Sequence, residues 1–160
     1  MGKSLHPNHA LMMKKNITTD ETANRTIQTL EAEFRYATVM LIDDNTIDTF
    51  IHKKLIESNH FAEQIQSHLD AREALEFLKN APENEWPELI LLDIMMPGMD
   101  GFEFLEAFAN LERNQKSRIK VILLSTSESF KDLNRANKNS LVKKFLNKPL
   151  TPEMLNAIRV

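Results

Sequence analysis

The chain has 160 residues, enough for one domain with room for additional elements. It contains no cysteine, which excludes disulfides, thiolate metal sites and thiol nucleophiles, and it has neither a segment long enough to span a membrane nor a signal peptide, so we expect a cytoplasmic protein. The net charge of −3 gives the whole chain no bias towards nucleic acid, although residues 116–148 carry nine Lys or Arg and two acidic residues. We interpret that basic segment as a solvated face or as a surface for an acidic protein.

Residues 1–36 precede the first strand-like segment, and we interpret them as an N-terminal extension to a domain that covers residues 37–160. Residues 1–17 are polar and unpatterned, as in a disordered tail, and the two histidines there, His6 and His9, are weak candidates for a metal site. From Thr18 a hydroxyl cap followed by two acidic residues predicts the start of a helix. Apolar residues then recur at spacings of four, three and four, which predicts a stripe on one helical face: Ala23, Ile27, Leu30 and Phe34. We expect this stripe to contact a second copy of the chain, giving a homodimer.

Strand-like and helix-like segments alternate after residue 37. Strands are predicted at residues 38–42, 61–67, 88–93, 119–124 and 142–146, and the polar alternate positions of 61–67 indicate an edge strand. The helix after the first strand is amphipathic, with Ile47, Phe50, Ile51 and Leu55 on one side. Caps predict three further helix starts, at Asp70 with Glu73, Asp100 with Glu103, and Thr151 with Pro152, and a weaker helical pattern runs through Phe130, Leu133 and Ala136. This alternation predicts an α/β fold, a parallel sheet with helices on both faces.

Polar residues lie at the carboxyl ends of the predicted strands: Asp43, Asp44, Asp93, Ser125 and Lys148. Because the carboxyl ends of parallel strands meet at one edge of the sheet, we expect these side chains to lie close together. Three carboxylates repel one another unless a cation lies among them, and oxygen ligands suit Mg²⁺. A lysine and a hydroxyl are suited to holding a phosphoryl group. The sequence therefore predicts a metal-assisted phosphoryl site.

These motifs resemble those of response-regulator receiver domains in two-component signalling. The resemblance extends from about Thr38 to the end of the chain. It rests on an Asp-Asp pair after the first strand, D-x-x-M-P-x-M-D-G after the third, a hydroxyl residue after the fourth and K-P after the fifth. It implies the flavodoxin-like (βα)₅ fold, a doubly wound parallel sheet with strand order 2-1-3-4-5, here with an N-terminal helical extension. The chain is similar to the chemotaxis response regulator in having no output domain.

The resemblance implies that Asp93 is the phosphoacceptor, a carboxylate nucleophile that takes a phosphoryl group from a phosphohistidine. It further implies that Mg²⁺ is bound directly by Asp44, Asp93 and the backbone carbonyl of Met95, with Asp43 acting through a coordinated water. The chain would then be a phosphoacceptor rather than an enzyme, with slow self-dephosphorylation at most. Its expected partners are a sensor histidine kinase or phosphotransfer protein and a downstream protein target that the sequence does not identify.

The remaining family roles concern the switch and the loops. Lys148 and Ser125 are expected to bind the phosphoryl group, and Phe145 to turn inward when Ser125 moves towards it. Structural roles are expected for Pro97, Gly101 and Pro149, and the Lys148–Pro149 peptide bond is expected to be cis. Three features depart from the family pattern: Asn139-Ser140-Leu141 replaces the usual Gly-Ala, the last helix, residues 152–160, is short, and the N-terminal extension has no counterpart in the basic fold.

Three alternative functions can be compared with the residues that each would require. A phosphotransferase of the haloacid dehalogenase type needs a second Asp two residues after the nucleophile, where this chain has Met95. A DNA-binding regulator needs a helix-turn-helix, and none follows the receiver before Val160. A pseudo-receiver, which keeps the fold as an unphosphorylated interaction module, is the main alternative function, although the intact site residues speak against it. We interpret Trp86, His52, His60 and His68 as structural or surface residues.

Overall fold

The computed structural model describes residues 33–112, 114, 116–126 and 129–160. The predicted tail and almost all of the predicted N-terminal helix lie outside the described residues. Phe34 is the one residue of the predicted apolar stripe that is described, and its side chain is 42% exposed.

Five parallel strands form one sheet in the order β2-β1-β3-β4-β5, which confirms the predicted fold class and strand order. The strands are β1 (Tyr36–Ile42), β2 (Ala62–His68), β3 (Leu89–Asp93), β4 (Lys120–Ser125) and β5 (Val142–Asn147). The helices are α2 (Thr46–Ser58), α3 (Ala71–Asn80), α4 (Gly101–Ala109), α5 (Phe130–Lys138) and α6 (Pro152–Ala157), with short 3₁₀ turns at Glu83–Glu85 and Lys116–Arg118. The predicted edge strand is β2, which pairs only with β1 among the described strands.

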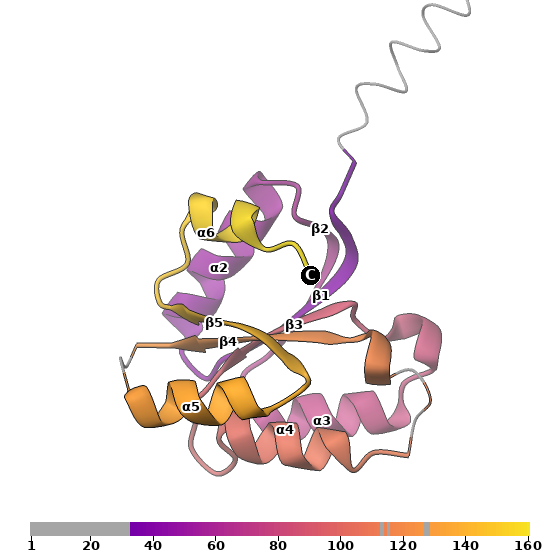
Figure 1. The fold of residues 1–160 in the computed structure, drawn as a ribbon. Coiled ribbons are helices and arrows are strands. Elements are labelled where there is room, and N and C mark those ends of the chain that lie inside the picture. Colours follow the sequence, from indigo (N-terminus) through magenta and orange to yellow (C-terminus); the bar gives the residue numbers. More distant parts are fainter. Residues whose placement is uncertain (1–32, 113, 115, 127–128) are drawn as a thin grey trace, which may run out of the picture. The chain divides into compact units, whose positions relative to one another are not determined.

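Helices cover both faces of the sheet, so the central strand β3 is buried along its whole length. Figure 1 shows α2 and α6 on one face and α3, α4 and α5 on the other. The alternating side chains of each central strand therefore enter two separate hydrophobic clusters. Leu89 and Leu91 pack on the α2–α6 side, whereas Ile90 and Leu92 pack on the α3–α5 side. An unbroken apolar run is what a parallel strand with both faces covered requires.

Side-chain caps begin the helices at the carboxyl edge of the sheet. Asp100 and Glu103 form the predicted capping box, with each carboxylate accepting a backbone N–H from the other residue at 2.8 Å. Asn45 caps α2 by accepting the N–H groups of Ile47 and Asp48. These caps satisfy backbone donors that a helix start leaves unpaired, so each helix begins at a fixed distance from the strand before it.

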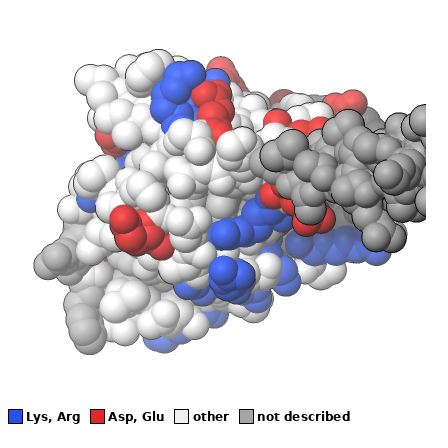
Figure 2. Space-filling view, turned by 90° about the horizontal axis from the view of Figure 1, so that it is seen from above, with Lys and Arg blue, Asp and Glu red and all other residues white. Residues whose placement is uncertain are grey.

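The orientation of α2 differs from the simplest interpretation of its apolar stripe. Ile47, Phe50 and Ile51 are 68%, 63% and 45% exposed, and the helix instead buries Thr49, His52 and Ile56. The physical reason is that the face with Thr49, His52 and Ile56 lies against the sheet. At the polar end of the sheet, Thr49 Oγ1 donates to the carbonyl oxygen of Asp43 at 3.2 Å. Figure 2 views the molecule from above, the side on which Figure 1 draws α2 and α6, and much of the surface there is uncharged.

The last helix is shorter than predicted, because α6 ends at Ala157 instead of continuing to Val160. The carbonyl groups at its end accept hydrogen bonds from a side chain near the start of the domain. The Arg35 guanidinium donates to the carbonyl oxygens of Leu155, Asn156 and Ile158 at 3.0, 3.2 and 3.1 Å. Within the described ranges every helix is too short or too polar to cross a bilayer.

Candidate metal and phosphoryl site

Three carboxylates meet at the carboxyl edge of the sheet. Asp43 and Asp44 follow β1, Asp93 is the last residue of β3, and one oxygen of each lies within 4.8 Å of the others. Asp43 is fully buried and Asp93 is 5% exposed, whereas Asp44 is exposed to solvent. The adjacent strands β1 and β3 pair in register up to Ile42 and Leu92, so the carboxylates that follow are placed side by side.

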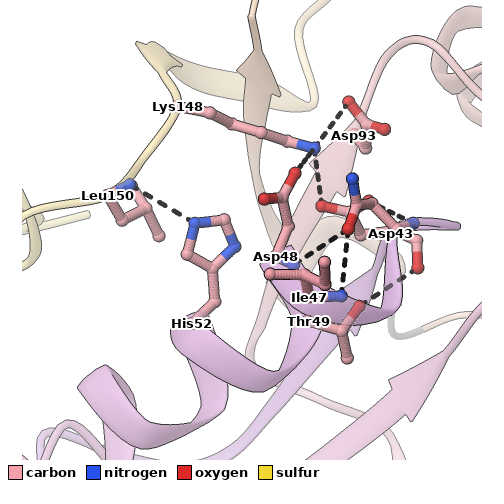
Figure 3. A network of polar contacts seen from close by, with 9 residues as sticks. Asp43, Ile47, Asp48, Thr49, His52, Asp93, Lys148 and Leu150 are labelled. Atoms are coloured by element: carbon pink, nitrogen blue, oxygen red, sulfur yellow. Dashed lines mark hydrogen bonds and ion pairs between the residues drawn. The ribbon is translucent and has the colours of Figure 1, made fainter.

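Lys148 reaches these carboxylates from the end of β5. Its Nζ lies 2.6 Å from Asp43 Oδ2 and 3.4 Å from Asp93 Oδ1, and its side chain is only 5% exposed (Figure 3). Its backbone N–H donates to the carbonyl oxygen of Ser125 at 2.9 Å, which ties the end of β5 to that of β4. The Lys148–Pro149 bond is cis, as predicted.

Burial sets the charge properties of the two central groups. Burial raises the pKa of Asp93 to about 6, against the opposing effect of the Lys148 charge, and the Asp43 charge raises it further. For Lys148 burial lowers the pKa, but the hydrogen bond to Asp43 and the charges of Asp93 and Asp43 outweigh it, so its pKa lies above the ordinary value. The ammonium is therefore charged at neutral pH, and it offsets part of the repulsion between Asp43 and Asp93.

The residues present fit a divalent cation. Asp43 Oδ1 accepts the N–H of Asn45 at 2.9 Å, and its buried Oδ2 lies 2.6 Å from the Lys148 ammonium. One ammonium cannot balance three converging carboxylates. Carboxylate oxygens at this spacing, one of them exposed so that water can complete the coordination, are ligands that Mg²⁺ accepts.

The other predicted site residues surround this cluster. Ser125 is fully buried at the end of β4, and Phe145 on β5 is partly buried against the α3–α5 cluster. The Met95 side chain is 66% exposed at the rim of the site. At the first residue of α4, a Cβ added to Gly101 would lie 2.6 Å from the carbonyl oxygen of Asp93, so α4 can start this close to the strand only with glycine there.

Two residues near the site received no site role from the sequence: Asp48 was not singled out, and His52 was interpreted only as a structural or surface residue. Asp48 Oδ2 lies 3.1 Å from Lys148 Nζ, and His52 Nε2 accepts the backbone N–H of Leu150 at 3.3 Å (Figure 3). Their partners lie 100 and 98 residues further along the chain, so no local pattern connects them. A usable signal existed: Asp48 and His52 are four residues apart on a helix that starts beside Asp43, which places both on one face.

Comparisons with known proteins agree with this fold. Residues 39–159 match the family model of the response regulator receiver domain. The chain is 33% identical over 129 residues to the probable methanogenesis regulatory protein FilR2 of Methanothrix harundinacea, covering 79% of this chain and 80% of that protein.

Solved structures give the same result. A two-component response regulator from Cytophaga hutchinsonii superposes with a TM-score of 0.71 at 32% identity, covering 76% of this chain and 92% of that one. A response regulator receiver protein from Dyadobacter fermentans gives a TM-score of 0.67 at 27% identity, covering 74% and 91%. The chain belongs to the response-regulator receiver family of two-component signalling.

Proposed function

We propose that this protein is a phosphoacceptor response regulator, in which Asp93 receives a phosphoryl group from a phosphohistidine of a sensor histidine kinase or a phosphotransfer protein. The observation that supports this most is the position of one buried ammonium, Lys148 Nζ, 3.4 Å from Asp93 within the cluster of three carboxylates. A cation beside a carboxylate at the carboxyl edge of a parallel sheet is an arrangement that binds and orients a phosphoryl group.

In the proposed reaction an oxygen of Asp93 attacks phosphorus, the phosphorus–nitrogen bond of the donor breaks, and the imidazole leaves with the electron pair and takes a proton from solvent. Asp43, Asp44, Asp93 and the carbonyl of Met95 would hold Mg²⁺, which when bound neutralises charge on the phosphoryl oxygens. Lys148 binds a phosphoryl oxygen, and its positive charge keeps Asp93 ionised against the effect of burial.

The proposed switch links the phosphoryl site to the surface around β5 through Ser125 and Phe145. Ser125 would move its hydroxyl to a phosphoryl oxygen, and Phe145 would turn into the space that this movement leaves. Ser125 and Phe145 lie on neighbouring strands, and β4 pairs with β5 from Val121 to Ser125. A change in the position of Phe145 would alter the surface presented to a downstream protein.

The surface beside the site supports a protein donor. Ile47, Phe50 and Ile51 expose apolar side chains on α2, and Met95 exposes its side chain on the loop after β3. Both elements begin within two residues of a site carboxylate, so a donor that brings a phosphohistidine to Asp93 would contact them. Exposed apolar groups of this kind favour contact with a protein over contact with a small phosphodonor alone.

We also propose a homodimer formed by the N-terminal stripe of Ala23, Ile27, Leu30 and Phe34. Isolated helices of this length are marginal in water, so an apolar stripe needs a partner. The exposed Phe34 ring, which lies 5.9 Å from the His60 ring, is the described part of this stripe.

The test is incubation with Mg²⁺ and acetyl phosphate, followed by intact mass measurement of the wild-type chain and of Asp93→Asn. We expect the mass of one phosphoryl group on the wild type and none on the variant, and none on either when EDTA is present. A wild-type chain that is folded, binds Mg²⁺ and gains no mass would favour the pseudo-receiver alternative.

A further inference from the structure

His52 is a buried titratable side chain for which the proposed reaction has no role. It lies on α2 and is 1% exposed. Its Nε2 accepts the backbone N–H of Leu150, so the ring proton must be on Nδ1, and Nδ1 has no hydrogen-bond partner among the described residues. Burial lowers the pKa of His52, with smaller opposing effects from Asp43 and Asp48 and a lowering effect from Lys148, which favours the neutral ring that can accept a hydrogen bond.

The hydrogen bond that His52 accepts from the Leu150 N–H fixes the segment that carries Lys148. Leu150 is 5% exposed and lies two residues after Lys148, in the turn between β5 and α6. That turn is also held by the bond from the Lys148 N–H to Ser125. The helix α2 therefore holds the lysine at two points, with Asp48 contacting Nζ and His52 contacting the backbone beyond the lysine (Figure 3).

We infer that His52 is a positioning residue for phosphoryl transfer: by accepting the Leu150 N–H, it fixes the turn from which Lys148 reaches Asp43 and Asp93. This inference rests on the proposed function. The distances make the position of the turn important, because Nζ is 2.6 Å from Asp43 but 3.4 Å from Asp93, so a small outward movement of the backbone separates Lys148 from Asp93 first. Misplacement of a catalytic group by about 1 Å can cost up to about a hundredfold in rate.

Substitutions at His52 separate positioning from packing. His52→Leu fills the space without an acceptor, whereas His52→Gln places an amide oxygen close to the position of Nε2. His52→Asn is polar but too short to reach Leu150, so it provides a second variant without the bond if the leucine variant does not fold. His60→Gln is the matched control, because His60 is an exposed histidine just beyond the far end of the same helix.

Three measurements are made on each folded variant: the rate of phosphorylation by acetyl phosphate with Mg²⁺, hydrogen exchange of the Leu150 amide, and Mg²⁺ affinity by calorimetry. For His52→Leu and His52→Asn we expect phosphorylation about tenfold slower, faster Leu150 exchange and tighter Mg²⁺ binding, because the ammonium no longer opposes the metal. His52→Gln is expected to restore most of the rate, and His60→Gln to match the wild type. Lys148→Ala provides the reference for Mg²⁺ affinity without the ammonium.

The inference is wrong if His52→Leu or His52→Asn phosphorylates at the wild-type rate, or if His52→Gln is as slow as they are. It is also wrong if Mg²⁺ affinity is unchanged in variants whose Leu150 amide has lost protection. A wild-type chain that acetyl phosphate does not phosphorylate would remove the proposed function instead, and the exchange and Mg²⁺ measurements would still show whether His52 holds the lysine in place.

Discussion

At the scale of single residues, Asp93 is costly to the metal-free fold. Its pKa in the folded state is about 6, compared with an ordinary value of 3.8, and the largest cause is burial. The folded state therefore binds the proton more tightly than the unfolded state does. The resulting contribution to stability is complete below pH 3.8 and is lost as the pH rises through 6. Above that range the ionised carboxylate costs about 3 kcal/mol, at about 1.4 kcal/mol per pKa unit.

Asp93→Asn should consequently stabilise the metal-free protein at neutral pH. We expect its free energy of unfolding to exceed that of the wild type by about 1–3 kcal/mol at pH 7.5 in EDTA, and the difference to be much smaller at pH 4. Urea denaturation at both pH values measures this, with Asp44→Asn as the control because Asp44 is exposed. A difference that does not change with pH would show that Asp93 carries no buried-charge penalty.

At the scale of elements, the two faces of α2 should respond differently to substitution. Ile56 is fully buried, whereas Phe50 is 63% exposed. We expect Ile56→Ala to lower the free energy of unfolding by about 2–4 kcal/mol and Phe50→Ala to change it by less than about 0.5 kcal/mol. Urea denaturation of the two variants tests the orientation of the helix, and equal losses would mean that the exposed stripe packs against something within the same chain.

Sequence reasoning succeeds for the strands and fails for the buried face of α2. The strands and the polar residues at their ends were predictable, because an unbroken apolar run such as Leu89–Leu92 has few alternatives and Asp93 follows it directly. The buried face of α2 was not, because its stripe of Ile47, Phe50 and Ile51 is more apolar than the face that packs on the sheet. The buried face is determined by the hydrogen bonds of Thr49 with Asp43 and of His52 with Leu150. Local periodicity cannot predict these bonds, because they depend on residues outside the helix.

A second prediction for an element concerns the end of α6. Arg35 donates to three carbonyl oxygens there, and its guanidinium lies 5.4 Å from the centre of the Phe61 ring. Arg35→Ala leaves these carbonyls to water, so we expect a loss of about 1 kcal/mol in the free energy of unfolding and faster amide exchange in α6. Arg159→Ala, which removes an exposed arginine near the same helix, is the control. Equal behaviour of the two variants would contradict the capping role.

At the scale of the whole molecule, the proposed role of the N-terminal stripe predicts the oligomeric state. We expect the full chain to sediment as a dimer at tens of micromolar and a chain that begins at Glu33 to sediment as a monomer. The shorter chain keeps Arg35, so the loss of dimer cannot be attributed to loosening of α6. Leu30→Asp in the full chain should also give a monomer, because a charge in an apolar interface is not compensated. Monomers for all three proteins would exclude the homodimer.

The measurement that tests the account most directly is the location of the phosphoryl group. After incubation with Mg²⁺ and acetyl phosphate, borohydride reduces an aspartyl phosphate to homoserine, and peptide mass spectrometry identifies the position. The account predicts homoserine at position 93 alone and none when EDTA is present. When Lys148 is replaced by Ala, the yield at position 93 should fall. Homoserine at Asp43 or Asp44, or an equal yield without Mg²⁺, would contradict it.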